Sequence, residues 1–330
     1  MAALLVVPLV YGIMSGTAQA QGQGSGQIPG QGPVGSFVVV DLFTKKILAG
    51  REINQRRQIA SITKVATAVV VLDWMELTGV GPGTQATVPQ SAALIGGGNP
   101  LGMRPGDRIA LRDALYAALI GSDNVAAETL ATFVGADLLR RAGKSGHPIG
   151  HFVEQMNALA SKHGMAGTKF TNPHGMDGQK PIPYSTAADV ARLSIVAMEK
   201  AGFRFYVAQA EREIGFHRGG EKLSFLVKNT NQLVREKGID GVKTGQTNLA
   251  GPCVVISGEK PPVVREGPGG QKEIIPHRLV VVVLGAQNRF PVAATLLQQG
   301  WAQFEGWNAA GRPVNAPDEL LSMQRTPPGR

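Results

Sequence analysis

Apolar residues recur at helical spacing through the middle of the chain. Residues 61–77 are apolar on almost every side, a pattern that predicts a buried helix. Other segments carry apolar residues on one face only, which predicts amphipathic helices and a closing helix near the C-terminus. These segments are 111–120, 125–134, 150–163, 186–201 and 291–304.

Strand signals lie at the two ends of the chain. The runs 36–41 and 46–49 flank a polar turn and predict a hairpin. Aliphatic runs return later, at Val242, 254–256 and 279–284. Because a helical middle separates these strands, the sequence predicts an α+β fold whose sheet joins N-terminal and C-terminal strands. The Pro-, Gly- and charge-rich segment 259–277 is expected to be an exposed excursion between two strands.

The N-terminus has the pattern of an export signal. Residues 1–20 carry no charge, 4–14 are mostly apolar, and Ala18 and Ala20 form a small-x-small cleavage pattern. This predicts a signal peptide over 1–20, too short to span a membrane comfortably. No Lys or Arg precedes the apolar stretch, so a disordered segment or a buried strand is the alternative. The Gly-, Gln- and Pro-rich residues 21–33 predict a flexible linker.

Composition narrows the class of protein. Of 330 residues, 43% are hydrophobic and 17% charged, which excludes a disordered chain. A single cysteine, Cys253, excludes an internal disulfide framework and a cysteine zinc site. We expect one folded domain over 34–307 and a loose tail over 308–330, because the tail offers little to pack.

The formal net charge is +9, and the uncharged leader leaves all of it on the mature chain. A basic protein favours anionic surroundings. Combined with predicted export, the charge favours a cell wall or membrane surface as partner and argues against nucleic acid. No later segment has the 18 consecutive apolar residues typical of a membrane span.

The first chemical motif runs from Ser61 to Lys64, at the start of the predicted buried helix. Residues three apart on a helix lie on one face, about 5–6 Å apart. Burial lowers a lysine pKa, so a neutral Lys64 could take a proton from Ser61. The spacing alone is weak evidence of function, because Ser257 and Lys260 repeat it in a predicted strand and loop.

A second motif, Ser122-Asp123-Asn124, falls between two predicted helices. The hydroxyl of Ser122 could relay a proton to a leaving group, and the amide of Asn124 could hold a substrate carbonyl. Ser, Asp and Asn are also favoured helix caps, which is the purely structural alternative.

The third motif, Lys243-Thr244-Gly245, lies on a predicted strand. Lys243 offers a positive charge, Thr244 a hydroxyl for a carboxylate, and Gly245 room for a substrate chain. Alone it is equally typical of an edge-strand lysine beside a bulge. Together, the three motifs occur in the order and the helix–loop–strand context of penicillin-recognising enzymes.

With these motifs the sequence resembles the low-molecular-mass penicillin-binding proteins, specifically serine D-alanyl-D-alanine carboxypeptidases of the penicillin-binding-protein 5 type. The resemblance runs from about residue 36 to 307 and includes the segments 119–126, 170–176, 229–231 and 241–247. Two residues depart from the family pattern: Ile59 stands where a proline is usual, and Gln246 where Tyr or His is commoner.

The resemblance implies a β-lactamase/transpeptidase-like fold, with an antiparallel sheet flanked by helices and a helical subdomain. It implies a bacterial enzyme exported to the periplasm or the extracytoplasmic membrane face. Such an enzyme removes the terminal D-alanine from peptidoglycan stem peptides, needs no cofactor or metal, and is inhibited by β-lactam antibiotics. Many members add an all-β domain and an anchoring helix, and we expect neither here because about two dozen residues follow the closing helix.

The resemblance also implies roles for individual residues. Ser61 is the expected nucleophile, Lys64 its base and Ser122 the proton donor to the leaving group. Arg278 is expected to bind the substrate carboxylate. The remaining expected substrate-binding residues are Asn124, Lys243, Thr244, Gly245 and Gln246, and the backbone N–H groups of Ser61 and Gln246 are the expected oxyanion donors.

Three alternative functions remain open at this stage, and one of them is lipid II transpeptidation on the same site. A class A-like β-lactamase would need a deacylating glutamate, and Glu154 with Asn157 is the one superficial candidate, in a well-patterned helix. A non-catalytic penicillin sensor or wall-binding module would need a signalling span or a partner domain. His147 and His151 are four apart, but the intervening Pro148 disfavours a helical zinc site.

Overall fold

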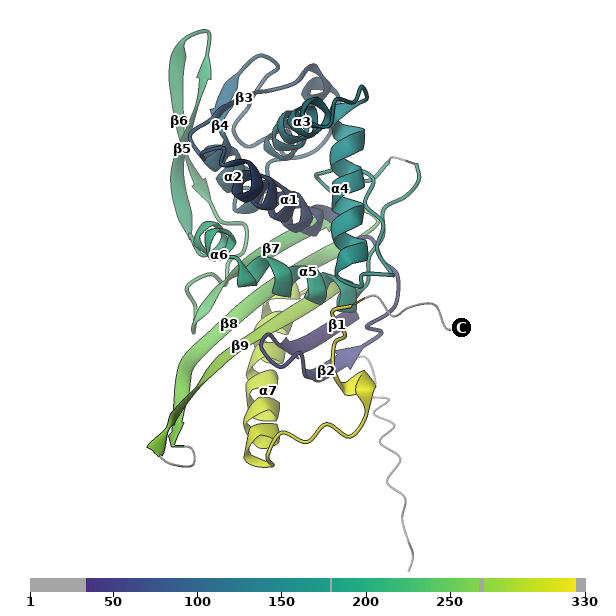
Figure 1. The fold of residues 1–330 in the computed structure, drawn as a ribbon, viewed down its shortest axis with the longest axis vertical. Coiled ribbons are helices and arrows are strands. Elements are labelled where there is room, and N and C mark those ends of the chain that lie inside the picture. The colour runs from purple at the N-terminus through teal and green to yellow at the C-terminus, as the bar shows by residue number, and fades with distance from the viewer. Residues whose placement is uncertain (1–33, 179, 267–269, 325–330) are drawn as a thin grey trace, which may run out of the picture.

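The computed structural model describes residues 34–178, 180–266 and 270–324. Its centre is a five-stranded antiparallel sheet in the order β2-β1-β9-β8-β7 (Figure 1). Strand β1 pairs with β9, so the sheet joins the two ends of the chain as predicted. The strands are β1 (Val34–Asp41), β2 (Ile47–Arg51), β7 (Ile239–Thr247), β8 (Gly251–Glu266) and β9 (Lys272–Ala286).

Strand β9 explains the valine run near the C-terminus. Val281 and Val283 belong to the core on the side of helix α7 (Arg289–Ala309), whereas Val280 and Val282 belong to the core on the opposite face. The sequence of a strand that is covered on both faces is a continuous apolar run. The opposite face is covered by α5 (Ala187–Glu199) and α6 (Ala201–Val207).

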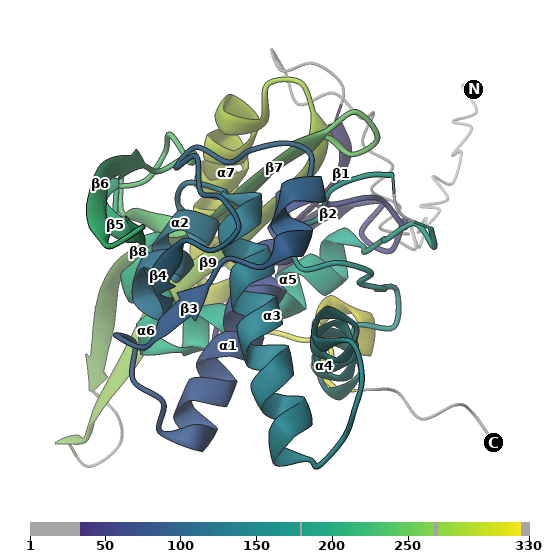
Figure 2. The ribbon, with the colours of Figure 1, turned by 90° about the horizontal axis from the view of Figure 1, so that it is seen from above.

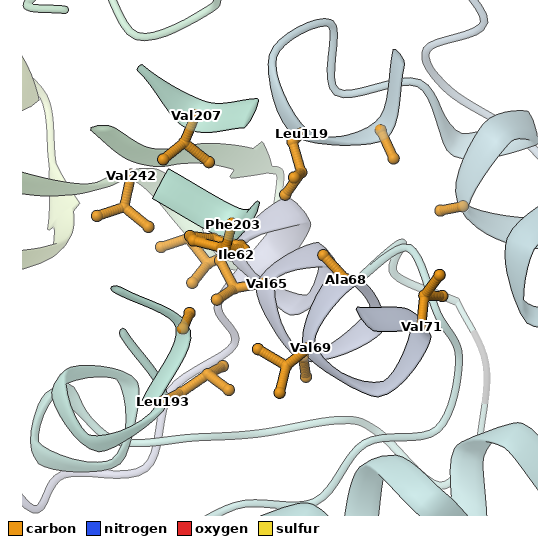
Figure 3. Close-up of a cluster of buried hydrophobic side chains, with 14 of the residues drawn as sticks. Ile62, Val65, Ala68, Val69, Val71, Leu119, Leu193, Phe203, Val207 and Val242 are labelled. Atoms are coloured by element: carbon orange, nitrogen blue, oxygen red, sulfur yellow. The ribbon is translucent and has the colours of Figure 1, made fainter. Parts of the chain in front are cut away.

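The helical region stands on the α5 side of the sheet, and helix α1 (Thr63–Thr78) passes through its middle (Figure 2). Because neighbours surround residues 63–71 of α1, this part of the helix needs no polar face. Figure 3 shows Ile62, Val65 and Val69 among apolar side chains from other elements. This packing fixes the start of α1. The surrounding helices are α2 (Leu111–Leu119), α3 (Asn124–Arg141) and α4 (Pro148–Lys162), and a 3-10 turn (Ala60–Ile62) precedes α1.

A second sheet, with the order β3-β4-β5-β6, was missed by the sequence analysis. Its strands are β3 (Gln85–Thr87), β4 (Arg108–Ala110), β5 (Glu211–Arg218) and β6 (Glu221–Lys228). Along β5, Ile214 and Phe216 are buried, whereas most of the other residues are charged and exposed. The strand therefore has too few apolar residues to be recognised from hydrophobicity. Gly219 and Gly220 turn the hairpin, and a Gly-Gly pair between alternating runs was the available signal.

Segment 259–277, expected as an exposed excursion between two strands, is mostly strand itself. Strands β8 and β9 continue past the sheet as a two-stranded arm (Figure 1). Val263 pairs with Ile275 and Val264 with Ile274, so β-branched residues sustain the strands. The register shifts between Lys260 and Val263, where two prolines occur. The exposure expected for this segment is found at Val264 and Ile274 on the arm, which are solvent-accessible.

The expectation of a loose tail after residue 307 is wrong for the part that the structure describes. Helix α7 continues to Ala309, and the chain then folds back on the β1–β2 turn. The N–H of Leu321 donates to the carbonyl of Lys45 at 2.8 Å, and Leu321 is only 3% exposed. Arg192 of α5 donates to the carbonyl of Ser322 at 2.6 Å. One buried leucine and these polar contacts dock the tail.

Within the described ranges, no helix combines the length and hydropathy required to cross a bilayer.

We predict that Leu321→Ala lowers the free energy of unfolding by about 2–3 kcal/mol, as expected for truncating a buried leucine. Leu226→Ala is the matched control, because Leu226 is 59% exposed and its truncation should change stability by less than about 0.5 kcal/mol. Urea denaturation measures both variants. Equal, small effects would mean that the tail does not dock in solution.

Candidate active site

A cleft of about 460 Å³ lies where β7 meets the helical region, and all three motifs contribute to its walls. Ser61 comes from the turn before α1, Ser122 and Asn124 from the junction of α2 and α3, and Thr244 and Gly245 from β7. Residues from three distant parts of the chain therefore meet at one place, as the sequence analysis predicted.

The amine of Lys64 is fully buried behind the nucleophile candidate. Its Nζ lies 2.8 Å from Ser61 Oγ, 2.7 Å from Asn124 Oδ1 and 2.9 Å from the carbonyl oxygen of His174. Burial lowers the pKa of Lys64 to about 7, against the opposing pull of the Asp123 carboxylate. A neutral amine can donate its two N–H bonds to the two carbonyl oxygens and direct its lone pair at the Ser61 hydroxyl.

The turn at 172–176 supports Lys64 and the nucleophile segment. Asn172 Oδ1 accepts from the N–H groups of His174 and Gly175 at 3.2 and 2.6 Å, and Thr67 donates to the carbonyl of Pro173 at 2.6 Å. Gly175 has a φ of +82°, and a Cβ there would lie 1.9 Å from the carbonyl oxygen of Ala60. Only glycine fits this contact, which gives a physical role to a segment that the sequence analysis noted without a role.

Ser122 sits in a strained backbone conformation. Its φ of +60° lies in the left-handed region, which is costly for a residue with a Cβ. Its neighbour Asp123 is the cap of α3, accepting from Ala126 N–H at 2.9 Å. The helix-cap alternative thus applies to Asp123, while Ser122 lines the cleft.

Asn124 supports Lys64 as well as lining the cleft. Its Oδ1 accepts from Lys64, and its Nδ2 donates to the carbonyl of Gly96 at 3.1 Å. Both ends of this amide are therefore engaged by the protein. Binding of a substrate amide by Asn124 stays a prediction.

The Lys243 side chain is 1% exposed, and its Nζ has no hydrogen-bond partner in the part of the chain that the structure describes. Burial, then the charges of Lys64 and Arg289, hold its pKa well below the usual lysine value. Beside it, the hydroxyls of Thr244 and Thr230 are 2.7 Å apart. A Cβ on Gly245 would lie 2.8 Å from the carbonyl oxygen of Ile59, so β7 passes directly against the nucleophile turn.

Arg278 does not lie in the cleft, which corrects the expected carboxylate contact. Thr244 and Val283 both lie opposite Val254, and Arg278 precedes Val283 by five residues, about 17 Å along β9. The Arg278 side chain is 6% exposed and is held by Asp240 and Glu259. Successive antiparallel strands reverse direction, so β9 reaches the cleft with its C-terminal end.

Arg289, the first residue of α7, stands three residues after this end of β9. Its guanidinium lines the cleft and donates to the carbonyl of Gly245 at 2.9 Å. The sequence analysis missed Arg289, Thr230 and Asp177, all of which line the cleft. Thr230 belonged to a segment quoted for the resemblance, and its N–H donates to the carbonyl of Ile120 at 2.9 Å. That bond ties Thr230 to the Ser122 junction.

The other candidates from the sequence lie elsewhere. Glu154 is 73% exposed and pairs with His151 on α4. His147 caps the same helix. Ser257 is buried and accepts from Arg278 at 2.9 Å, while Lys260 lies over the Trp301 ring and pairs with Glu305.

Comparisons with known proteins agree with this geometry. A solved DD-transpeptidase of Streptomyces K15 has a TM-score of 0.68 at 23% identity, with 82% of this chain and 97% of that structure covered. Penicillin-binding protein D2 from Listeria monocytogenes, in its ampicillin-bound form, has a TM-score of 0.61 at 24% identity, with 81% and 97% covered. Both share the expected fold, which is thereby confirmed.

Sequence comparison identifies the family. DacB2, a D-alanyl-D-alanine carboxypeptidase of Mycobacterium tuberculosis, is 31% identical over 286 residues, which cover 86% of this chain and 88% of the relative. A family model described as D-alanyl-D-alanine carboxypeptidase, peptidase family S11, matches residues 26–263. The chain therefore belongs to the D-alanyl-D-alanine carboxypeptidase family of serine peptidases.

Proposed function

We propose that this protein removes the terminal D-alanine from peptidoglycan stem peptides through an acyl-enzyme on Ser61. The observation that carries the proposal is the 2.8 Å contact between Ser61 Oγ and a fully buried Lys64 amine. A serine hydroxyl is a weak nucleophile unless a base takes its proton. A lysine with a pKa of about 7 can act as that base near neutral pH.

The first half-reaction is acyl transfer to the serine. Ser61 Oγ attacks the carbonyl carbon of the penultimate D-alanine while its proton passes to Lys64 Nζ. The negative charge that develops on the carbonyl oxygen is bound by the backbone N–H groups of Ser61 and Gln246. One such donor contributes about 2.7–4 kcal/mol to transition-state stabilisation.

The end of acylation and the hydrolysis that follows it release the two products. The peptide C–N bond breaks as the Ser122 hydroxyl donates a proton to the departing amine, and Ser122 recovers a proton from Lys64. Water then attacks the ester carbonyl and gives one proton to Lys64. The Ser61 oxygen leaves, takes a proton back, and the shortened peptide departs with a new carboxylate.

The free carboxylate of the terminal D-alanine is recognised by Arg289, with Thr244 and Thr230 beside it. In the described part of the chain, only Nη1 of Arg289 has hydrogen-bond partners, Gly245 O and Gln246 Oε1. Its Nε and Nη2 donors therefore stay free for a substrate oxygen. Because an arginine can hold a carboxylate with two parallel bonds, it fixes orientation as well as charge.

Inhibition by β-lactams is part of the proposal. The Listeria relative was solved with ampicillin bound, and a β-lactam carries both a reactive amide and a carboxylate. The rival β-lactamase function needs a deacylating glutamate in the cleft, and no described residue that lines the cleft is a glutamate. The expected export is also part of the proposal, since its substrate lies outside the cytoplasm. Residues 1–33, which carry the predicted leader and linker, lie outside the described residues.

We expect benzylpenicillin to add covalently to Ser61, because Lys64 activates this serine alone. Intact-protein mass spectrometry should show one adduct that persists for minutes, and peptide mapping should place it on Ser61. Ser61→Ala should abolish the adduct. Ser257→Ala, which removes the other serine with the same spacing to a lysine, should keep it. Rapid penicillin turnover without an adduct would favour a β-lactamase function. An adduct on Ser257 would contradict the assignment of Ser61 as the nucleophile.

Arg289→Ala should lower kcat/KM for a D-Ala-D-Ala peptide by about 10- to 150-fold, equivalent to about 1.5–3 kcal/mol for a hydrogen bond to a charged group. In Arg289→Ala, amidation of the peptide C-terminus should lower kcat/KM little further, because the contact with the carboxylate is already lost. Arg278→Ala is the control: because Arg278 pairs with Asp240 and Glu259, it should lower stability and leave kcat/KM near wild type. A large loss of kcat/KM in Arg278→Ala, with little loss in Arg289→Ala, would show that Arg278 binds the carboxylate.

A further inference from the structure

We propose that Glu128 is a positioning residue for Lys64: it holds the ring of His174, and His174 in turn keeps the Lys64 amine directed at Ser61. The inference rests on the proposed function and adds to it a residue outside the three motifs. Glu128 is not among the residues that line the cleft, so it acts through its neighbours and not by touching the substrate. The contacts of its two carboxyl oxygens carry the inference.

The first step concerns the place of Glu128 in the fold. It lies on α3, four residues after Asn124, and residues four apart share one face of a helix. Helix α3 packs against α1 (Figure 2), and Asn124 reaches Lys64 from this face. The Glu128 side chain is 6% exposed. A buried carboxyl group is costly unless polar partners hold it, and Glu128 has one partner beside each oxygen.

The two oxygens of Glu128 contact two different segments. Oε1 accepts from the Ser91 hydroxyl at 2.8 Å, which ties the 3-10 helix Gln90–Leu94 to α3. Oε2 lies 4.0 Å from Nε2 of the His174 ring, which is 4% exposed. This separation is longer than a hydrogen bond. The attraction across it is electrostatic and is strengthened by the low dielectric of a buried site.

The His174 ring presents an N–H group to Glu128. Its Nδ1 accepts from the N–H of Met176 at 3.2 Å, so Nδ1 carries no proton. Burial, then the charge of Lys64, lowers the pKa of His174 to about 3, and the ring is therefore neutral near pH 7. A neutral imidazole with a bare Nδ1 carries its proton on Nε2. Each ring nitrogen thus has a contact that fixes the orientation of the ring.

His174 connects this contact to the base. Its carbonyl oxygen accepts from Lys64 Nζ at 2.9 Å, and it is one of the two oxygens that direct the lone pair of the amine at Ser61. Without Glu128 the ring is held at Nδ1 alone, and the turn that carries the carbonyl is less firmly fixed. A displacement of about 1 Å at a reacting group can cost about 100-fold in rate. Glu128 therefore keeps one acceptor of Lys64 in place.

The bond to Ser91 gives Glu128 a competing, purely structural role. Two substitutions separate the roles. Ser91→Ala removes the bond to Glu128 and leaves the His174 contact. Glu128→Gln keeps both contacts, because its amide oxygen can accept from His174 Nε2–H while its NH₂ group donates to the Ser91 hydroxyl. Burial also raises the pKa of Glu128, so a neutral side chain of the same shape is a close substitute.

The test measures the second-order rate constant for acylation of Ser61 by benzylpenicillin near pH 8, where most Lys64 is neutral. Glu128→Leu, which has a similar size but no oxygens, should lower the rate constant by about 10- to 100-fold. Glu128→Gln should recover most of the rate, and Ser91→Ala should stay close to wild type. His174→Ala should lose as much as Glu128→Leu. The double variant should lose no more than either single one, because Glu128 acts through the ring.

Three results would overturn the inference: a wild-type rate in Glu128→Leu, an equal loss in Ser91→Ala or in Glu128→Gln, or losses that add in the double variant. Urea denaturation checks that each variant is folded in the assay. If Glu128→Leu does not fold, His174→Ala decides, and a wild-type rate in that variant overturns the inference. In each of these cases an adduct on Ser61 leaves the proposed function standing. If the wild-type protein forms no adduct on Ser61, the proposed function fails and the inference falls with it.

Discussion

The buried amine of Lys64 is the interaction on which the site depends. It contacts Ser61 in the turn before its own helix, Asn124 at the start of α3, and the carbonyl of His174 in the turn that fits under Ala60. One nitrogen thus holds together three segments that pack separately against α1. Removal from water lowers its pKa to about 7, so the packing that builds the fold also prepares the base. Residues 63–71 of α1 are buried on every side, which keeps water away from this amine.

Most of the fold could be predicted from hydrophobic patterning. The helices and the sheet that joins both chain ends were predicted because each has a long periodic run or a run covered on both faces, such as 279–284. The β5–β6 hairpin was missed because one of its faces is charged and exposed. The docked tail was missed because a single buried residue, Leu321, provides its apolar anchor, and one residue has no periodicity.

The site could be predicted as far as local motifs reach. Ser61, Lys64, Ser122 and Thr244 belong to motifs whose spacing encodes their geometry, and the structure brings them together. Arg289 is isolated in sequence and reaches the cleft through the direction of β9 and the length of the arm before it. Neither property is visible in a motif, which is why Arg278 was chosen instead. Arg278 and Arg289 have the same side-chain chemistry, and only their positions in the fold determine which of them lines the cleft.

The central claim is that Lys64 is neutral when it activates Ser61, and the pH dependence of acylation tests it most directly. The second-order rate constant for benzylpenicillin, measured by stopped flow on the wild-type protein, reports the free enzyme. Protonation of Lys64 removes the base, so the rate should fall about tenfold per pH unit below 7, reach half its maximum near pH 7 and level off above it. A rate that keeps rising tenfold per unit toward pH 10, or one that is flat from pH 5 to 9, would contradict the claim.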